Sequence, residues 1–424
     1  MSQEYFDTFC EILNEELQPA LGCTEPIAIA YAASMMRQTL GCVPSLIKIR
    51  TSGNIIKNVK AVTVPNSGGM KGIEAAAILG TLGGRADLVL EVLSCITADQ
   101  IEETRKLIGE GYASVCLATG VPSLYIEIAG EKDGHSALCI VAGEHTNITR
   151  LEKDGKVIID KKSCANENEV KTDRSSLSVC RIIDFAKNVP LAAIDKVITR
   201  QIEYNSAIAR EGLSRKYGVS VGRTLLTHYD ASDVRIRARA MAAAGSDARM
   251  SGCSLPVIIN SGSGNQGLTV SLPVIEYAKE YKKSHEELVR ALALSNLIAV
   301  HQKRYIGPLS AFCGAVNAAT GAAAGICFLL GGSDEEISQT ITDVLANVGG
   351  IVCDGAKPSC AAKISSALEA AILSYEMTKE GNCFKGGEGL VNSDIEKTIE
   401  SFGRVGREGM KETDAEILKI MLDN

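Results

Sequence analysis

The first part of the chain carries apolar residues at helical spacing. In residues 5–18, single apolar residues stand among polar ones at this spacing. Residues 27–40 form a second run that is more apolar. Thr24 can cap the second run, because Glu25 and Pro26 follow it in the first turn, where helix starts favour them. We therefore predict two helices joined by a short turn.

The pattern changes after residue 43. Residues 44–65 are rich in β-branched residues and alternate between apolar and polar, which is typical of strands. A glycine-rich turn at 66–69 leads into a helix, and residues 123–160 predict three antiparallel strands separated by Asp-Gly turns. The segment 43–184 therefore indicates a smaller α+β domain.

Strand patterns nearly vanish after residue 185, and a series of helices is predicted instead. These helices are 191–215, 233–249, 268–283, 285–305, 311–330, 334–347, 361–379 and 411–422. We expect 1–42 to pack with 185–424 as a mostly helical catalytic domain, with 43–184 as an insertion. The predicted fold class is α+β.

Composition excludes several classes of protein. The 424 residues are 46% hydrophobic and 22% charged, so the chain can bury a large core. The net charge is −7 and no basic tract stands out, which argues against a nucleic-acid partner. Aromatic residues make up only 4% and Trp is absent, which argues against base-stacking surfaces.

The cysteine count and the N-terminal pattern indicate a reducing compartment. The chain has 14 cysteines, and its first residues show no signal-peptide pattern, so we expect a cytoplasmic protein without a disulfide framework. The stretch 305–333 contains no charged residue, but Gly, Ala and Asn dilute its apolar character. A buried helix suits this stretch better than a membrane span.

A glycine-rich turn at 260–267 is the first candidate site. Gly262, Gly264 and Gly267 match the dinucleotide fingerprint, but the residues that follow are helical, where a Rossmann unit needs a second strand. A helix N-terminus can instead bind an anion such as a substrate carboxylate. A simple tight turn is the alternative interpretation. The candidate substrate-binding residues are Asn260, Ser261, Ser263, Gly264 and Asn265, together with Asn66 and Ser67 of a similar NSG turn.

Cysteines form the second group of candidates. Cys353 and Cys360 flank a polar turn, and Cys313 lies 40 residues before the first of them. Such loops hold iron–sulfur ligands, although buried packing cysteines are the common alternative. Cys23 precedes a predicted helix, whose N-terminus lowers a thiol pKa, while Glu25 opposes that shift. His145 is a minor candidate.

Four motifs together resemble a known family. GCTEP (22–26), NSGSGNQG (260–267), AFCGA (311–315) and CDGAKPSC (353–360) resemble the L-cysteine desulfidase family, which is itself similar to the α chain of the iron–sulfur L-serine dehydratases. The resemblance extends over almost the whole chain. It implies a [4Fe-4S] cluster on Cys313, Cys353 and Cys360, with Cys23 as the catalytic base and no pyridoxal phosphate.

The activity that this resemblance implies is β-elimination from L-cysteine, giving hydrogen sulfide, ammonia and pyruvate. Three cysteine ligands leave one iron open to act as a Lewis acid. The alternatives are an L-serine dehydratase, a nicotinamide dehydrogenase and a non-catalytic iron–sulfur or amino-acid sensor. We expect the three cysteines to meet in the fold and the 66–69 turn to face them. The expected partner is a small amino acid, and the sequence leaves open whether the chain forms a homo-oligomer.

Overall fold

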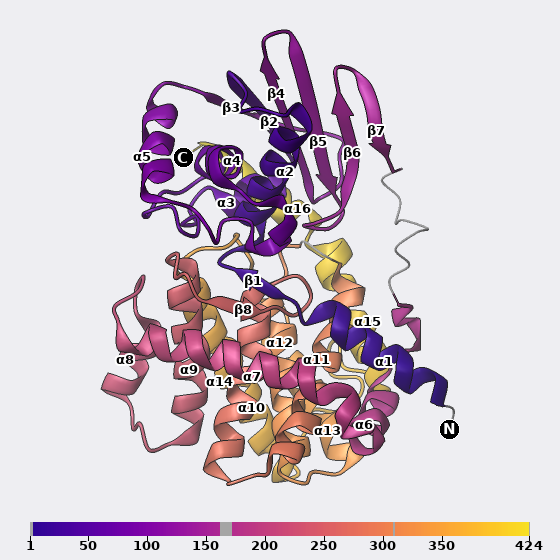
Figure 1. The fold of residues 1–424 in the computed structure, drawn as a ribbon. Helices are drawn as coiled ribbons and strands as arrows, with labels where there is room; N and C mark the ends of the chain where they lie inside the picture. Colours follow the sequence, from indigo (N-terminus) through magenta and orange to yellow (C-terminus); the bar gives the residue numbers. More distant parts are fainter. Residues whose placement is uncertain (1–2, 162–171, 308–309, 424) are drawn as a thin grey trace.

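The computed structural model describes residues 3–161, 172–307 and 310–423. It consists of a helical body and a body built on one sheet, drawn below and above in Figure 1. The two bodies meet at a short two-stranded sheet, in which β1 (Pro19–Leu21) pairs antiparallel with β8 (Pro256–Ile258). The fold is α+β, as the sequence predicts.

The helical body has one extended core around the apolar helix α12 (Gly314–Leu329), which packs against α10, α11, α13 and α14. Its other helices are α1 (Gln3–Glu16), α6 (Val179–Asn188), α7 (Leu191–Ser214), α8 (Val221–His228), α9 (Val234–Met250), α10 (Gly264–Glu280), α11 (His285–Ile306), α13 (Asp334–Val348), α14 (Cys360–Lys379) and α15 (Ile395–Arg404). Short helical turns span Arg174–Ser176 and Val405–Gly409. None of the helices formed by the described residues is long and apolar enough to cross a lipid bilayer.

The second body is a six-stranded sheet with helices packed on one face. Its strands are β2 (Leu46–Thr51), β3 (Ala113–Leu117), β4 (Tyr125–Lys132), β5 (His135–Ala142), β6 (Ile148–Lys153) and β7 (Lys156–Asp160), in the order β3-β2-β4-β5-β6-β7. Only β2 and β3 run parallel. The helices of this body are α2 (Thr24–Leu40), α3 (Gly53–Val59), α4 (Ile73–Gly83) and α5 (Ala98–Gly109), with a 3₁₀ turn at Ala86–Glu91. The apolar side chains of α2 and α4 share one core with the inner face of the sheet.

The packing of the N-terminal helices corrects the expected domain boundary. Phe9 and Leu13 of α1 lie in the core of the helical body, but Ile27 and Met36 of α2 lie in the core of the sheet body. Helix α2 is buried on nearly all sides, because it lies between the sheet and α4. The prediction that 1–42 packs as a unit with 185–424 is therefore wrong for α2. Residue type identified the helix but could not identify its packing partner.

Two further segments differ from the predicted organisation: the segment 53–59 and the C-terminal helix. Residues 53–59 form helix α3, where strand was predicted. Helix α16 (Lys411–Asp423), at the C-terminal end of the chain, packs against α3, so the C-terminal end of the sequence contributes to the sheet body. The buried Lys57 of α3 forms an ion pair with Asp414 of α16. This contact holds α3 in place beside the cavity described below.

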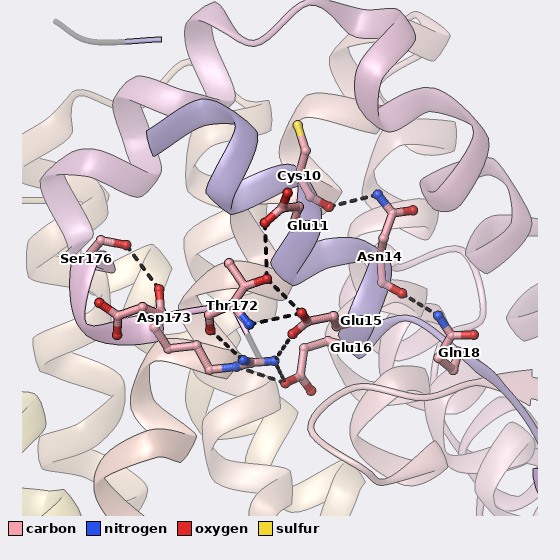
Figure 2. Close-up of polar contacts among 10 residues, drawn as sticks. Cys10, Glu11, Asn14, Glu15, Glu16, Gln18, Thr172, Asp173 and Ser176 are labelled. Atoms are coloured by element: carbon pink, nitrogen blue, oxygen red, sulfur yellow. Dashed lines mark hydrogen bonds and ion pairs between the residues drawn. The ribbon is translucent and has the colours of Figure 1, made fainter. Parts of the chain in front are cut away.

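A polar network fixes the point at which the chain returns from the sheet to the helical body (Figure 2). Arg174 forms ion pairs with Glu15 and Glu16 of α1, at 2.8 and 2.7 Å. The hydroxyl of Thr172 donates a hydrogen bond of 2.7 Å to Glu15. The return segment is thus attached to α1, which precedes the β1 crossing between the two bodies.

Candidate active site

Four helices begin around one cavity of about 130 Å³ between the two bodies. Cys23, Ser263 and Cys313 are the N-cap residues of α2, α10 and α12, and Cys360 is the first residue of α14. All four residues line the cavity. Helix N-termini carry partial positive charge, so their convergence favours an anionic ligand.

The structure brings the three candidate cluster cysteines to this cavity. A backbone bridge between Phe312 and Val352 sets their two loops side by side. The thiol of Cys313 consequently donates a hydrogen bond to the sulfur of Cys353. Cys360 follows at the start of α14 and lines the same wall. The gap of 40 residues between the first two cysteines is therefore closed by a local pairing of loops.

The surroundings favour a thiolate at Cys353, whereas the pKa of Cys313 and, through burial, that of Cys360 are raised. The hydrogen bond from Cys313 lowers the pKa of Cys353 to about 6 despite burial, and the charges of Lys57 and Lys363 act in the same direction. The same hydrogen bond, together with burial, raises the pKa of Cys313. Since the thiolate is the form that binds a metal, the pair presents a ligand at neutral pH.

The donor set fits an iron–sulfur cluster better than a single metal ion. No group of three or more His, Cys, Asp or Glu side chains in the described ranges could hold one metal ion. In a cluster, however, each thiolate binds a different iron atom, so the sulfurs need to surround a space and not converge on one point. Three thiols that line one cavity meet this need, and the ammonium groups of Lys57 and Lys303, which also line it, suit an anionic thiolate cluster.

In the same cavity, Cys23 lies beside the carboxylate of Glu25, which hydrogen bonds hold in place. Its sulfur is 3.0 Å from Oε2 of Glu25, which also accepts a hydrogen bond from the hydroxyl of Thr24. The side-chain amide of Asn58 donates to Oε1 of Glu25 at 3.0 Å. Burial alone raises the pKa of Glu25, but the charge of His145 and the hydrogen bond from Cys23 outweigh it and hold the pKa below its usual value. Glu25 is therefore ionised.

The protonation state of Cys23 corrects the expectation from the sequence. Burial raises the pKa of its thiol well above the ordinary value, and the charge of Glu25 raises it further, while Arg249 opposes both only in part. The lowering of this thiol pKa that was expected from the helix N-terminus is therefore outweighed. Complete burial next to a carboxylate outweighs the helix dipole, so Cys23 rests as a thiol that donates to Glu25.

The 260–267 turn contributes only some of its predicted residues. Ser261, Ser263 and Asn265 line the cavity. Asn260 is fully buried and donates its amide to Asn296, and neither Asn260 nor Gly264 lines the cavity. A Cβ atom on Gly264 would lie 2.3 Å from Nε of Arg249, so the glycine allows the guanidinium to approach.

The glycine fingerprint in this turn does not mark a dinucleotide site. The preceding strand, β8, has only three residues and pairs antiparallel with β1, whereas a Rossmann unit requires parallel strands.

The second NSG turn lies elsewhere, so the expectation that it faces the cysteines is wrong. Asn66 lines a separate pocket and donates its amide to the carbonyl of Leu93. Ser67 is buried and donates to the carbonyl of Met70 within its own turn. The polar groups of this turn satisfy backbone carbonyls of the sheet body. The repeated tripeptide was therefore a local turn signal and not a second arm of the site.

A family model described as the serine dehydratase alpha chain matches residues 87–419. The chain belongs to this family. The UPF0597 protein of Lachnoclostridium phytofermentans is 52% identical over 413 residues, covering 97% of this chain and 99% of the relative. The UPF0597 protein of Desulfitobacterium hafniense is 51% identical over 419 residues, covering 99% and 97%, and that of Treponema denticola is 48% identical over 421 residues, covering 98% of both.

Membership of the serine dehydratase alpha family confirms the resemblance to that chain and indicates a lyase. Iron–sulfur cofactors are typical of this family, and the three thiols that line the cavity are suitable ligands for such a cofactor.

Several residues that line the cavity of this serine dehydratase alpha family member were not predicted from the sequence. Lys57 and Asn58 lie on the segment that was predicted as strand, and both line the cavity. Arg249 and Lys303 lie at the ends of long helices, where a basic residue usually caps the helix in solvent. His145, a minor candidate, reaches the cavity from the sheet body, and its ring lies 3.5 Å from the position of a Cβ on Gly262. The signal available in the sequence was a basic residue that follows a run of small residues, as Arg249 does.

Proposed function

We propose that the chain is a lyase, independent of pyridoxal phosphate, that converts L-cysteine to hydrogen sulfide, ammonia and pyruvate. The observation that carries this proposal is the presence of three candidate cluster thiols and the Cys23–Glu25 pair around one small cavity. A β-elimination requires a base for the α-proton and a group that stabilises the leaving thiolate. The cavity offers residues for both tasks.

Cys313, Cys353 and Cys360 would hold a [4Fe-4S] cluster. A cluster with three protein ligands supplies an open iron as a Lewis acid, and soft thiolate sulfur suits iron–sulfur centres. Lys57 is already paired with Asp414, so Lys303 is the cation beside these cysteines that would balance the negative charge of the thiolates.

Cys23 and Glu25 would act together as the base. Glu25 accepts the thiol proton of Cys23 along their 3.0 Å hydrogen bond, and the Cys23 sulfur takes the α-proton of the substrate. The two transfers leave a neutral Cys23 and a protonated Glu25, so the pair gains one proton from the substrate. Asn58 and Thr24 fix the carboxylate in the orientation that this transfer needs.

The main alternative is an L-serine dehydratase that uses the same residues. The family description favours it, since serine differs from cysteine only in the leaving atom. A non-catalytic sensor would need the cluster thiols but not a buried thiol hydrogen-bonded to an ionised carboxylate. The Cys23–Glu25 pair therefore favours catalysis over sensing.

The ratio of kcat/KM for L-cysteine to that for L-serine tests the proposed substrate. With anaerobically reconstituted protein, we expect equal amounts of sulfide and pyruvate from L-cysteine. We expect L-cysteine to be preferred by more than ~10-fold, a difference of about 1.4 kcal/mol in the activation barrier. A preference for L-serine would assign the chain to the dehydratases, and the absence of both activities would contradict the proposal.

A further inference from the structure

One buried cation of the cavity forms no ion pair with any of the described residues. Arg249, near the end of α9, is 2% exposed and lines the cavity, and its Nε has no hydrogen-bond partner. Within the described ranges no carboxylate lies within ion-pair distance of it, and its charge acts on the carboxylate of Glu25 only from beyond that distance. Other arginines of α9 do form ion pairs: Arg235 with Asp233, Arg237 with Glu280 and Arg239 with Glu369. A buried guanidinium without a partner is costly, so an anionic ligand that pairs with it would be bound strongly.

The guanidinium of Arg249 lies beside a second source of positive potential, the N-terminus of α10. Its Nε lies against the first turn of α10, at Gly264, where a side chain would collide with it. The N-terminus of α10 and the guanidinium therefore act on the same part of the cavity. Burial raises the pKa of both Cys23 and Cys360, and the charge of Arg249 opposes this rise at each thiol. Arg249 thus lies close both to the proposed base and to the candidate cluster cysteines.

Two unpartnered acceptors belong to the same wall. Oδ1 of Asn265 and Oε1 of Gln266 are buried without a hydrogen-bond partner, and both residues line the cavity on the first turn of α10. An anion site alone would not use them. A guanidinium beside free carbonyl oxygens matches a zwitterion, which presents one carboxylate and one ammonium group.

We propose that Arg249 binds the α-carboxylate of an amino-acid substrate, and that Asn265 and Gln266 accept hydrogen bonds from its α-ammonium group. The inference rests on the proposed function for the identity of the substrate and extends it to the residues that select an α-amino acid. The planar guanidinium can hold both carboxylate oxygens, which fixes the Cα atom between Cys23 and the cluster cysteines. Lys303 is less suited to this role, because its ammonium interacts with Cys313 and Cys353.

Calorimetric binding of L-alanine to the anaerobic holoprotein tests the inference. L-Alanine has the zwitterion but no leaving group, and ethylamine lacks the carboxylate. We expect the parent protein to bind L-alanine and not ethylamine. Arg249→Met should weaken L-alanine binding by ~100-fold or more, because the carboxylate loses a buried, charged partner. Arg235→Met, which removes an exposed arginine of the same helix, should bind as the parent does.

The ligand-free proteins provide an independent measurement. Arg249→Met removes an unpaired buried charge, so its thermal midpoint should equal or exceed that of the parent, with unchanged iron content and visible spectrum. Arg249→Lys keeps the charge but not the planar fork, and its affinity should lie between those of the parent and Arg249→Met.

Several results would overturn the inference. These are failure of the parent to bind L-alanine, L-alanine binding by Arg249→Met within a few-fold of the parent, or a lower thermal midpoint with iron loss and unchanged affinity. The last result would make Arg249 a counter-charge of the cluster. Failure of the proposed function is distinguishable, because Arg249-dependent binding of L-alanine without sulfide release would leave the inference standing and indicate a sensor.

Discussion

Replacing Cys23 with serine is expected to lower turnover of L-cysteine by about 10²- to 10⁴-fold per bound cluster. A serine hydroxyl is far less acidic than a thiol, so Glu25 cannot draw off its proton to create a base. The cluster cysteines are not altered, so iron content and the visible spectrum should match the parent. Activity per bound cluster, measured for both proteins anaerobically, is the quantity to compare.

A matched control and a second variant separate catalysis from packing. Cys139→Ser also changes a fully buried cysteine, but in the sheet core, so it should reduce stability and leave activity per cluster unchanged. Glu25→Gln should resemble Cys23→Ser, and the double variant should be little worse than either, because residues that act as a unit are not additive. Activity of Cys23→Ser within a few-fold of the parent would make Cys23 a packing residue.

Replacing Cys353 with serine should remove the iron and the activity together. A hydroxyl is a hard ligand with little affinity for iron–sulfur centres, and Cys353 is the sulfur that accepts the hydrogen bond from Cys313. Turnover should fall to background. Iron content and the visible spectrum after anaerobic reconstitution are the measurements.

Cys383→Ser is the control for this variant, because Cys383 is a partly buried cysteine that does not line the cavity. We expect it to keep parental iron content and turnover. A Cys353→Ser protein with parental iron content would exclude this residue as a ligand.

Elements with a strong pattern were predictable from the sequence, whereas their partners were not. The helical spacing after residue 185 corresponds to real helices, and the segment 123–160 is antiparallel as predicted but forms four strands and not three. The apolar run of α2 was also recognised as a helix, but its burial in the sheet core depends on α4 and on the sheet. Local periodicity says which face is apolar and carries no information on which distant segment covers it.

The same limit applies to the site. Motifs identified Cys313, Cys353 and Cys360, and the structure places all of them on one cavity. The protonation state of Cys23 could not be predicted, because it depends on burial by residues far along the chain. Arg249 was missed, since only the fold shows that this helix end faces a cavity and not solvent.

The dependence of lyase activity on the cluster tests the central claim most directly. The protein should be prepared anaerobically without pyridoxal phosphate, freed of iron by a chelator and reconstituted with increasing iron and sulfide. We predict that the rate of sulfide and pyruvate release from L-cysteine rises in proportion to cluster bound per chain, from background in the iron-free protein. Full activity without iron, or activity that requires added pyridoxal phosphate, would contradict the account.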